Sequence, residues 1–426
     1  MLLKCLLHLG ESSIKVVYRS KQDCNDGKNI IKLQGYGILR LKNFSVKDLD
    51  TVAEFLVQNS DVTLTTCGPE TEMETEPVGC ITGLTAQRLK FKLEKFFGIR
   101  LQIYPEIMAI EKIAKLMAEL DIGYYDLEYG AFEVAATRVK VMLDVFARLP
   151  TLGETTLKDY EFVEEHDRPG VFKDGADLTD NYRFVKKFDG PIFELVKSTD
   201  IKEWAAKYLQ PSSGHLVTPC ILMVFGSAAV AYLVTDDYEV KLVDVCSAAG
   251  KSFHGLVEEV TGEKSMDEIM KMAARGNLNN VTTLNSDLRN YEHTEHDWYT
   301  LFPDEYPVFE LGKLTSANAK GKGIYSKEDL AAGILNVVTM MISKCAYNQC
   351  KIRELHRVYF AGHFISYELV RKMITSNFLG QAFWLGLEKG YFIKPLFVRQ
   401  SGFLKALGLW FANVGLNNKN KKNKKT

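Results

Sequence analysis

The sequence has almost no net charge. It contains 53 Lys and Arg residues against 54 Asp and Glu, for a formal net charge of −1 over 426 residues. Proteins that bind nucleic acid usually concentrate Lys and Arg into a basic face. The missing basic excess predicts a protein without a nucleic-acid partner.

Closely paired cysteines are also missing. The eight cysteines are scattered along the chain, and the closest two, Cys345 and Cys350, have four residues between them. Structural zinc sites use tighter pairs with a second pair nearby. We therefore predict reduced, mostly buried thiols and a reducing compartment, the cytoplasm.

No uncharged run is long enough to suggest a membrane span. The run over 219–234 falls short of about 20 residues and is broken by a proline, a glycine and a serine. A buried hairpin that turns at Gly226-Ser227 is the better prediction. Residues 1–9 are apolar but interrupted by a lysine and a histidine, and no small-residue cleavage site follows. We expect neither a signal peptide nor a membrane partner.

A predicted strand at 240–245 leads into a loop of small residues, SAAGKS at 247–252, which opens a predicted helix over 253–260. This order points backbone N–H groups and the helix dipole at one place, which suits a phosphate. The end of the loop matches the second half of the P-loop motif G-x-x-x-x-G-K-[ST]. The position of the first glycine of that motif is occupied by Val245, and without that glycine the loop cannot easily curl around a phosphate. A second interpretation of the loop is therefore needed.

Further motifs stand along the chain in a fixed order. They are HLGESSIK at 8–15, TGLTA at 82–86, YPEIMAI at 104–110, VFGSAAV at 224–230, SAAGKSF at 247–253, SKEDLA at 326–331 and FAGHF at 360–364. Their shared order resembles type II (eukaryotic-type) pantothenate kinases, which have the actin/hexokinase-like ATPase fold. The resemblance covers residues 1–115 and 216–410. It implies an α/β protein with two duplicated domains around a nucleotide cleft.

The chain departs from the family pattern at several positions. His8 stands where the family has an Asp that holds Mg²⁺ through water, and Glu11 replaces a glycine of the first phosphate loop. Leu242 replaces an arginine that grips substrate, with Lys241 beside it as a possible substitute. These departures leave open whether the chain is an active kinase or a catalytically impaired relative, a pseudokinase acting as a regulatory or binding subunit.

We expect four regions. Residues 1–120 form an N-terminal α/β domain with the first phosphate loop and the catalytic glutamate, and 121–216 form an insertion that is atypical of the family. Residues 217–412 form a C-terminal α/β domain with the second phosphate loop and the adenine-side motif, and 413–426 form a disordered tail rich in Lys and Asn.

Hydrophobic periodicity and capping signals predict the secondary structure. Strands are expected at 2–9, 14–18, 30–39, 62–67, 79–81 and 358–360. Helices are expected at 46–56, 86–97, 106–120, 132–146, 201–209, 326–344, 367–375 and 380–387.

Site residues follow from the resemblance. It implies that Glu106 is the carboxylate that accepts or orients the proton of the attacking hydroxyl. A glutamate in a first helical turn is also favoured by the helix dipole alone. The remaining candidates are Gly10, Ser12, Ser13 and Lys15 for the first phosphate loop, Gly250, Lys251 and Ser252 for the second, Gly362 for adenine, and Ser227 and Lys241 for substrate or CoA. No direct metal ligand is expected.

The function implied by the resemblance is ATP-dependent phosphorylation of pantothenate to 4′-phosphopantothenate, the first step of coenzyme A biosynthesis. ATP and Mg²⁺ would be the cofactors, and CoA or acyl-CoA a possible feedback inhibitor. The resemblance also implies a homodimer, or a heterodimer with a paralogue, through the long helix that begins at Ser326.

Overall fold

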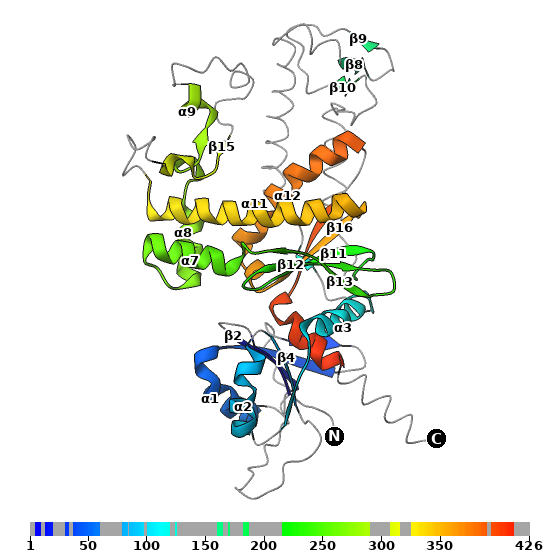
Figure 1. The fold of residues 1–426 in the computed structure, drawn as a ribbon, viewed down its shortest axis with the longest axis vertical. Coiled ribbons are helices and arrows are strands. Elements are labelled where there is room, and N and C mark those ends of the chain that lie inside the picture. The colour runs from blue at the N-terminus through cyan, green and yellow to red at the C-terminus, as the bar shows by residue number, and fades with distance from the viewer. Residues whose placement is uncertain are drawn as a thin grey trace, which may run out of the picture.

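The fold is described over residues 5–9, 13–19, 30–33, 37–59, 79–83, 85–97, 100–119, 124–125, 160–164, 169–170, 182–186, 215–289, 307–315, 325–389 and 393–412 of a computed structural model. It contains two six-stranded sheets, one at the lower end in Figure 1 and one near the middle. The first lies with α1 (Leu49–Asn59) and α2 (Ala86–Phe97), and the second lies beneath the long helix α11 (Lys327–Arg353).

The first sheet has the strand order β3-β4-β2-β1-β5-β6. Its strands are β1 (Cys5–Leu9), β2 (Ser13–Arg19), β3 (Ile30–Leu33), β4 (Gly37–Ser45), β5 (Gly79–Thr82) and β6 (Leu101–Ile103). The hairpin strands pair antiparallel, whereas β5 and β6 continue from β1 in parallel. The single strand predicted at 30–39 is wrong, because the chain turns back on itself between β3 and β4 and β4 runs on to Ser45.

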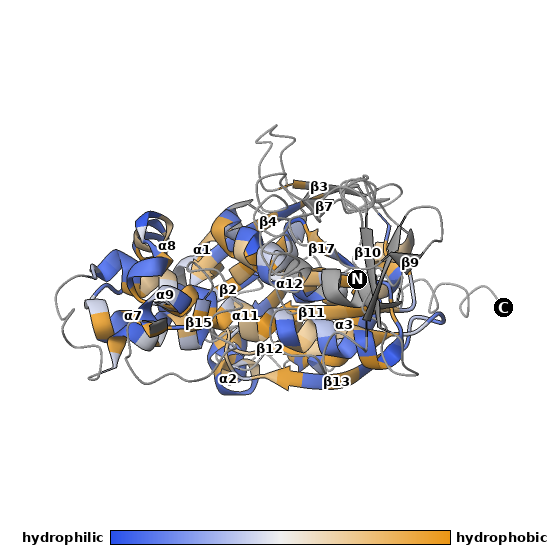
Figure 2. Ribbon diagram, turned by 90° about the horizontal axis from the view of Figure 1, so that it is seen from above, coloured by the Kyte–Doolittle hydropathy of each residue, from blue (hydrophilic) through white to orange (hydrophobic). Residues whose placement is uncertain are grey.

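The second sheet has the order β13-β12-β11-β16-β17-β7. Its strands are β7 (Tyr124–Tyr125), β11 (Cys220–Phe225), β12 (Ala229–Val234), β13 (Val240–Cys246), β16 (Arg357–Gly362) and β17 (Lys394–Val398). Every residue of β11 is buried, and β11 pairs antiparallel with β12. The run over 219–234 is therefore the predicted buried hairpin. In Figure 2, β13 at the sheet edge carries both hydrophobic and hydrophilic colours, and of its residues only Val240 is buried.

The two sheets repeat one topology. The order β4-β2-β1-β5-β6 of the first sheet matches β13-β12-β11-β16-β17 of the second: three antiparallel strands and then two strands parallel to β1 or β11. The edge strands β3 and β7 lie outside this repeat. Gly83 follows β5 with φ +116°, and Gly362 ends β16 with φ +115°. A Cβ at Gly83 would lie 2.2 Å from the carbonyl oxygen of Leu9, at the end of β1, and a Cβ at Gly362 would lie 2.1 Å from that of Phe225, at the end of β11.

This duplication confirms the predicted actin/hexokinase-like α/β fold. It also excludes the P-loop interpretation, because Val245 lies inside β13, an antiparallel edge strand rather than a strand leading into a glycine loop.

Helices α11 and α12 (Glu368–Lys389) contact the second sheet, and α7 (Gly250–Thr261) and α8 (Met266–Arg275) pack against α11. The short helix α9 (Asn285–Arg289) lies apart from this sheet, next to β14 (Thr283–Leu284). α11 begins with a capping box: Asp329 N donates to Ser326 Oγ over 3.1 Å, and Ser326 N donates to Asp329 Oδ2 over 2.8 Å. The helix continues nine residues past the predicted end at Lys344. α12 is one helix where two were predicted.

α11 is the one helix among the described residues that is long and apolar enough to cross a membrane. Its most apolar window is 67% buried inside the protein, where it contacts α7, α8 and α12. Burial of this kind is what a core helix shows.

Short sheets complete the described structure. β8 (Tyr160–Glu164), β9 (Pro169–Gly170) and β10 (Tyr182–Lys186) pair with one another, and β14 (Thr283–Leu284) pairs with β15 (Pro307–Phe309). The predicted strand at 62–67, the predicted helices at 132–146 and 201–209 and the tail at 413–426 lie outside the described residues.

Candidate functional site

The junction of the two halves is built by α3 (Glu106–Glu119) and a helix over 404–412. The two helices touch closely, since a Cβ at Gly408 would lie 1.9 Å from the carbonyl oxygen of Ala109. The buried face of α3 belongs to the same apolar core as Leu222 and Trp410 of the second half. α3 follows the first sheet in sequence but packs on the second.

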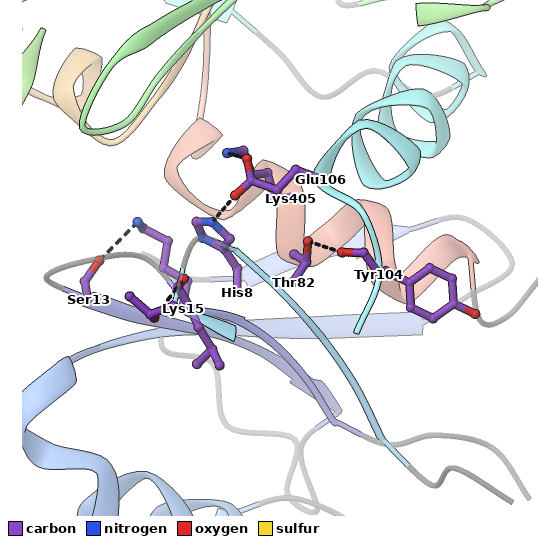
Figure 3. A network of polar contacts seen from close by, with 9 residues as sticks. His8, Ser13, Lys15, Thr82, Tyr104, Glu106 and Lys405 are labelled. Atoms are coloured by element: carbon purple, nitrogen blue, oxygen red, sulfur yellow. Dashed lines mark hydrogen bonds and ion pairs between the residues drawn. The ribbon is translucent and has the colours of Figure 1, made fainter. Parts of the chain in front are cut away.

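The start of α3 is fixed to the first sheet. Thr82 Oγ1, at the end of β5, donates to the carbonyl oxygen of Tyr104 over 2.8 Å, and Tyr104 N donates to the carbonyl oxygen of Ile81 over 2.9 Å. His8 of β1 pairs with Thr82 in the neighbouring strand. The first residue of α3, Glu106, is thereby placed above the carboxyl ends of β1 and β5 (Figure 3).

Two cationic or basic side chains meet the Glu106 carboxylate from opposite halves of the protein (Figure 3). Lys405 Nζ of the 404–412 helix lies 2.5 Å from Glu106 Oε2, and His8 Nε2 lies 3.8 Å from Glu106 Oε1. Burial alone would raise the pKa of Glu106, but the neighbouring His8 and the charge of Lys405 lower it to about 2. Glu106 is therefore a carboxylate at neutral pH, and its side chain retains 34% of its surface exposed.

His8 is a neutral base in this site. Burial, reinforced by the positive charges of Lys405 and Lys15, lowers the pKa of His8 to about 4 despite the opposing effect of Glu106. Its Nδ1 atom is buried and makes no hydrogen bond to any described residue. A neutral imidazole with an unpaired ring nitrogen can accept a hydrogen bond from a ligand.

Lys15 lies beside His8 on the same face of the sheet, because the two residues are direct cross-strand partners. Its side chain is buried, and its ammonium donates one hydrogen bond among the described residues, to Ser13 Oγ over 3.1 Å. Burial, and then the charge of Lys405, lowers the pKa of Lys15 to about 8. Since no carboxylate of the described residues pairs with it, an anionic ligand would satisfy it.

The phosphate-loop residues predicted in the second half also converge. Gly250 lies against the Gly226 turn and the ring of Phe364, because a Cβ there would be 3.4 Å from both. α7 begins at Gly250, three residues earlier than predicted, and its N-cap Ala249 provides no side-chain cap. Ser252 Oγ donates to the carbonyl oxygen of Ser247 over 3.0 Å, and Lys251 is exposed.

Gly362 links this group to the junction. Ser401 Oγ accepts from Gly362 N over 3.0 Å and donates to the Gly362 carbonyl oxygen over 3.1 Å. Partial burial, and then the positive charge of Lys15, lowers the pKa of the next residue, His363. The end of β16 therefore lies near Lys15 of β2, the strand that also contacts residues 401–403.

Lys241 does not join the other candidates. It pairs with Leu233 near the start of β13 and forms an ion pair with Glu239 over 3.3 Å. The Gly226-Ser227 turn stands at the other end of that strand, where Ala229 pairs with Cys246. Five strand residues separate the two ends, or about 16 Å. Gly10 and Ser12 lie outside the described residues.

Lys405 was missed by the sequence reasoning. It is the one charged residue over 401–412 in the sequence SGFLKALGLWFA. A single lysine in an otherwise apolar helix was the available signal. Nothing in the local sequence points to Glu106, 299 residues earlier.

The fold and the site define a kinase-like protein of the actin/hexokinase-like class. The Fumble family model matches residues 183–412, just over half of the chain. The chain therefore belongs to the Fumble family. The match does not include the first half, in which His8, Lys15 and Glu106 lie.

Curated relatives include both kinases and a phosphatase. The 4′-phosphopantetheine phosphatase of Mus musculus is 28% identical over 208 residues, 48% of this chain and 23% of its own length. Pantothenate kinase 1 of Arabidopsis thaliana is 29% identical over 198 residues, 45% of this chain and 47% of its own. Pantothenate kinase 1 of Oryza sativa subsp. japonica is 27% identical over 204 residues, 47% of this chain and 28% of its own.

These matches confirm the resemblance to pantothenate kinases as that of a divergent member, and the chain spans less than half the length of each relative. Among solved structures, the glucokinase of Balamuthia mandrillaris in complex with glucose aligns over 96% of this chain and 92% of its own, at 8% identity and a TM-score of 0.36.

Proposed function

We propose that this chain uses ATP and Mg²⁺ to phosphorylate pantothenate to 4′-phosphopantothenate. The observation that carries the proposal is the Glu106 carboxylate, held between His8 of the first half and Lys405 of the second. Phosphoryl transfer needs a group that orients the attacking hydroxyl and cations that neutralise phosphate charge. Glu106 supplies the first, and the buried Lys15 supplies one of the second.

In the proposed reaction, the primary hydroxyl of pantothenate attacks the γ-phosphorus of ATP, the bond to the β-γ bridging oxygen breaks, and ADP leaves. Glu106 accepts the hydroxyl proton or holds it by a hydrogen bond until transfer is under way. His8 Nδ1, which has no partner among the described residues, accepts a second hydrogen bond from the bound substrates. Ser227 at the hairpin turn is the proposed contact to pantothenate or to a CoA inhibitor.

The described residues do not form a Mg²⁺ site of their own. They contain no group of three or more His, Cys, Asp or Glu side chains arranged to hold a metal ion. Mg²⁺ prefers oxygen ligands, whereas His8 presents nitrogen, and Glu106 is paired with Lys405. In this proposal Mg²⁺ is carried by the phosphate oxygens of ATP, where it neutralises charge.

The remaining features of the proposal follow from the family. We propose a cytoplasmic enzyme, a homodimer or a heterodimer with a paralogue, and inhibition by CoA or acyl-CoA. The outer face of α11 is the proposed dimer surface, and it carries the exposed Met341 and Ile352.

The test is an assay of the purified protein with ATP, Mg²⁺ and pantothenate, with 4′-phosphopantothenate measured by mass spectrometry. We expect slow turnover, and we expect Glu106→Gln to lower it about 10²–10⁴-fold, the usual cost of removing a general base. Nucleotide binding by the variant, measured by thermal shift, should persist. The exposed Glu239→Gln serves as the matched control and should leave the rate unchanged.

Two outcomes would contradict the proposal. ATP binding by the wild type without turnover would identify a catalytically impaired binding subunit. Release of phosphate from 4′-phosphopantetheine without kinase activity would place the chain with the activity named for its mouse relative.

A further inference from the structure

Two lysines from opposite halves of the chain lie near the His8–Glu106 pair, Lys15 as the cross-strand partner of His8 and Lys405 in contact with Glu106. Lys15 comes from β2 and donates to Ser13, whereas Lys405 comes from the 404–412 helix and forms an ion pair with Glu106. Each lysine side chain is largely buried: Lys15 is 7% exposed, and the Lys405 side chain is 17% exposed. With His8 neutral, this cluster carries more positive than negative charge.

Excess positive charge in a buried cluster is unfavourable unless an anion compensates it. The two ammonium groups are close enough that the charge of Lys405 contributes to lowering the pKa of Lys15. The single negative charge of Glu106 can neutralise one of the two ammonium groups, and it pairs with Lys405. A phosphate group offers several acceptor oxygens and at least one negative charge, which matches what the cluster lacks.

We propose that Lys405 is a phosphate-contacting residue that changes its partner when an anion binds. Without an anion it pairs with Glu106. When a phosphoryl group is bound between Lys15 and Lys405, the Lys405 ammonium donates to a phosphoryl oxygen instead. Glu106 Oε2 is then free to accept a hydrogen bond from the hydroxyl of the second substrate. The identities of the anion and the hydroxyl rest on the proposed function.

The chemistry of lysine suits this exchange. Its ammonium is a compact charge with three donors on a flexible stem, so it can move between two acceptors without matching a planar geometry. The helix that carries Lys405 is fixed against α3 by the Gly408–Ala109 contact, so that the exchange requires movement of the side chain and not of the helix. The exchange would make the availability of Glu106 depend on phosphate occupancy.

The experiment measures binding of inorganic pyrophosphate to the full-length protein by isothermal titration calorimetry. We expect Lys405→Met to weaken binding about tenfold, as the loss of one charge-assisted hydrogen bond would do, and Lys405→Arg to retain most of the affinity. Glu106→Gln should tighten binding, because it frees Lys405 and removes a repelling charge. Lys271→Met, which breaks an exposed ion pair with Glu268 on α8, is the matched control and should change nothing.

A folded Lys405→Met protein that binds pyrophosphate as tightly as the wild type would overturn the proposal, as would a wild type that binds none. If Lys405→Met does not fold, unchanged affinity in Glu106→Gln would overturn it instead. The two proposals can fail separately. If Lys405→Met binds pyrophosphate more weakly but the wild type does not turn over pantothenate, only the proposed reaction is contradicted. If the wild type turns over pantothenate but Lys405→Met binds pyrophosphate as tightly as the wild type, only the role of Lys405 is contradicted.

Discussion

Gly408 packs directly on the backbone of Ala109, so closely that a Cβ on Gly408 would lie 1.9 Å from the Ala109 carbonyl oxygen and 2.7 Å from its carbonyl carbon. This contact fixes the distance between the helix that carries Lys405 and the helix that carries Glu106. The first residue of α3 can meet a lysine from the end of the chain because a glycine lets the two backbones touch.

Gly408→Ala is expected to destabilise the protein. The new methyl group meets backbone, which cannot move aside as a side chain would, and overpacking of this kind costs about 1–3 kcal/mol. The midpoint of thermal or urea unfolding measures the loss. Gly255→Ala is the matched control, because Gly255 lies in α7 with nothing within 4 Å of its Cβ position. It should gain stability of up to roughly 1 kcal/mol from helix propensity. Equal effects at the two glycines would contradict the close helix contact.

His8 is expected to make the protein less stable as the pH falls from about 7 to 5. Its pKa is about 4 in the folded protein against 6.5 ordinarily, so the unfolded chain binds the proton first and the unfolded state is favoured over that interval. The effect on the free energy of unfolding is about 2 kcal/mol between pH 7.5 and 5. The charged groups that face the imidazole are Lys15, Lys405 and Glu106. The pKa of Glu106 is about 2 in the folded protein against 4.5 ordinarily, so its carboxylate stabilises the fold above pH 4.5. This stabilisation is lost only as the pH falls from 4.5 toward 2, below the interval in which His8 acts.

Urea unfolding of the wild type and of His8→Asn at several pH values checks this. The variant should lose most of the decline between pH 7 and 5, because asparagine does not titrate there. The same decline in both proteins would show that other groups cause it.

Lys15→Met is expected to stabilise the anion-free protein while it weakens anion binding. Burial lowers the pKa of Lys15 to about 8 against 10.5 ordinarily, so keeping the ammonium charged at pH 7 costs about 3 kcal/mol of folding free energy. As the pH rises from 8 toward 10.5, the Lys15 ammonium loses its proton in the folded protein but keeps it in the unfolded chain, so this cost falls. Methionine has a similar stem without the charge.

Thermal unfolding with and without pyrophosphate separates the two effects. The melting temperature of Lys15→Met should rise without pyrophosphate and respond less to its addition. A lower melting temperature without pyrophosphate would mean that the hydrogen bond to Ser13 outweighs the cost of burying the charge.

The sequence by itself determined the features that depend on neighbours in the chain. The apolar run over 219–234 specified a buried hairpin, and Ser326 and Asp329 specified the capping box that starts α11. Both signals operate within one hairpin or one helical turn, where residue types and spacing fix the hydrogen bonds. The order of short motifs along the whole chain indicated the fold class through a family resemblance.

Tertiary structure decided what lies between distant segments. It split the predicted strand at 30–39 into two, since the strand pairing and not the apolar pattern decides where a chain turns. It left Lys241 at the far end of β13, away from Ser227, the other residue expected to bind substrate or CoA. Above all, it brought Lys405 to Glu106 across 299 residues. That contact depends on sheet order, on the anchoring of α3 at Thr82 and on the space left by Gly408, and none of these is expressed in the residues next to either partner.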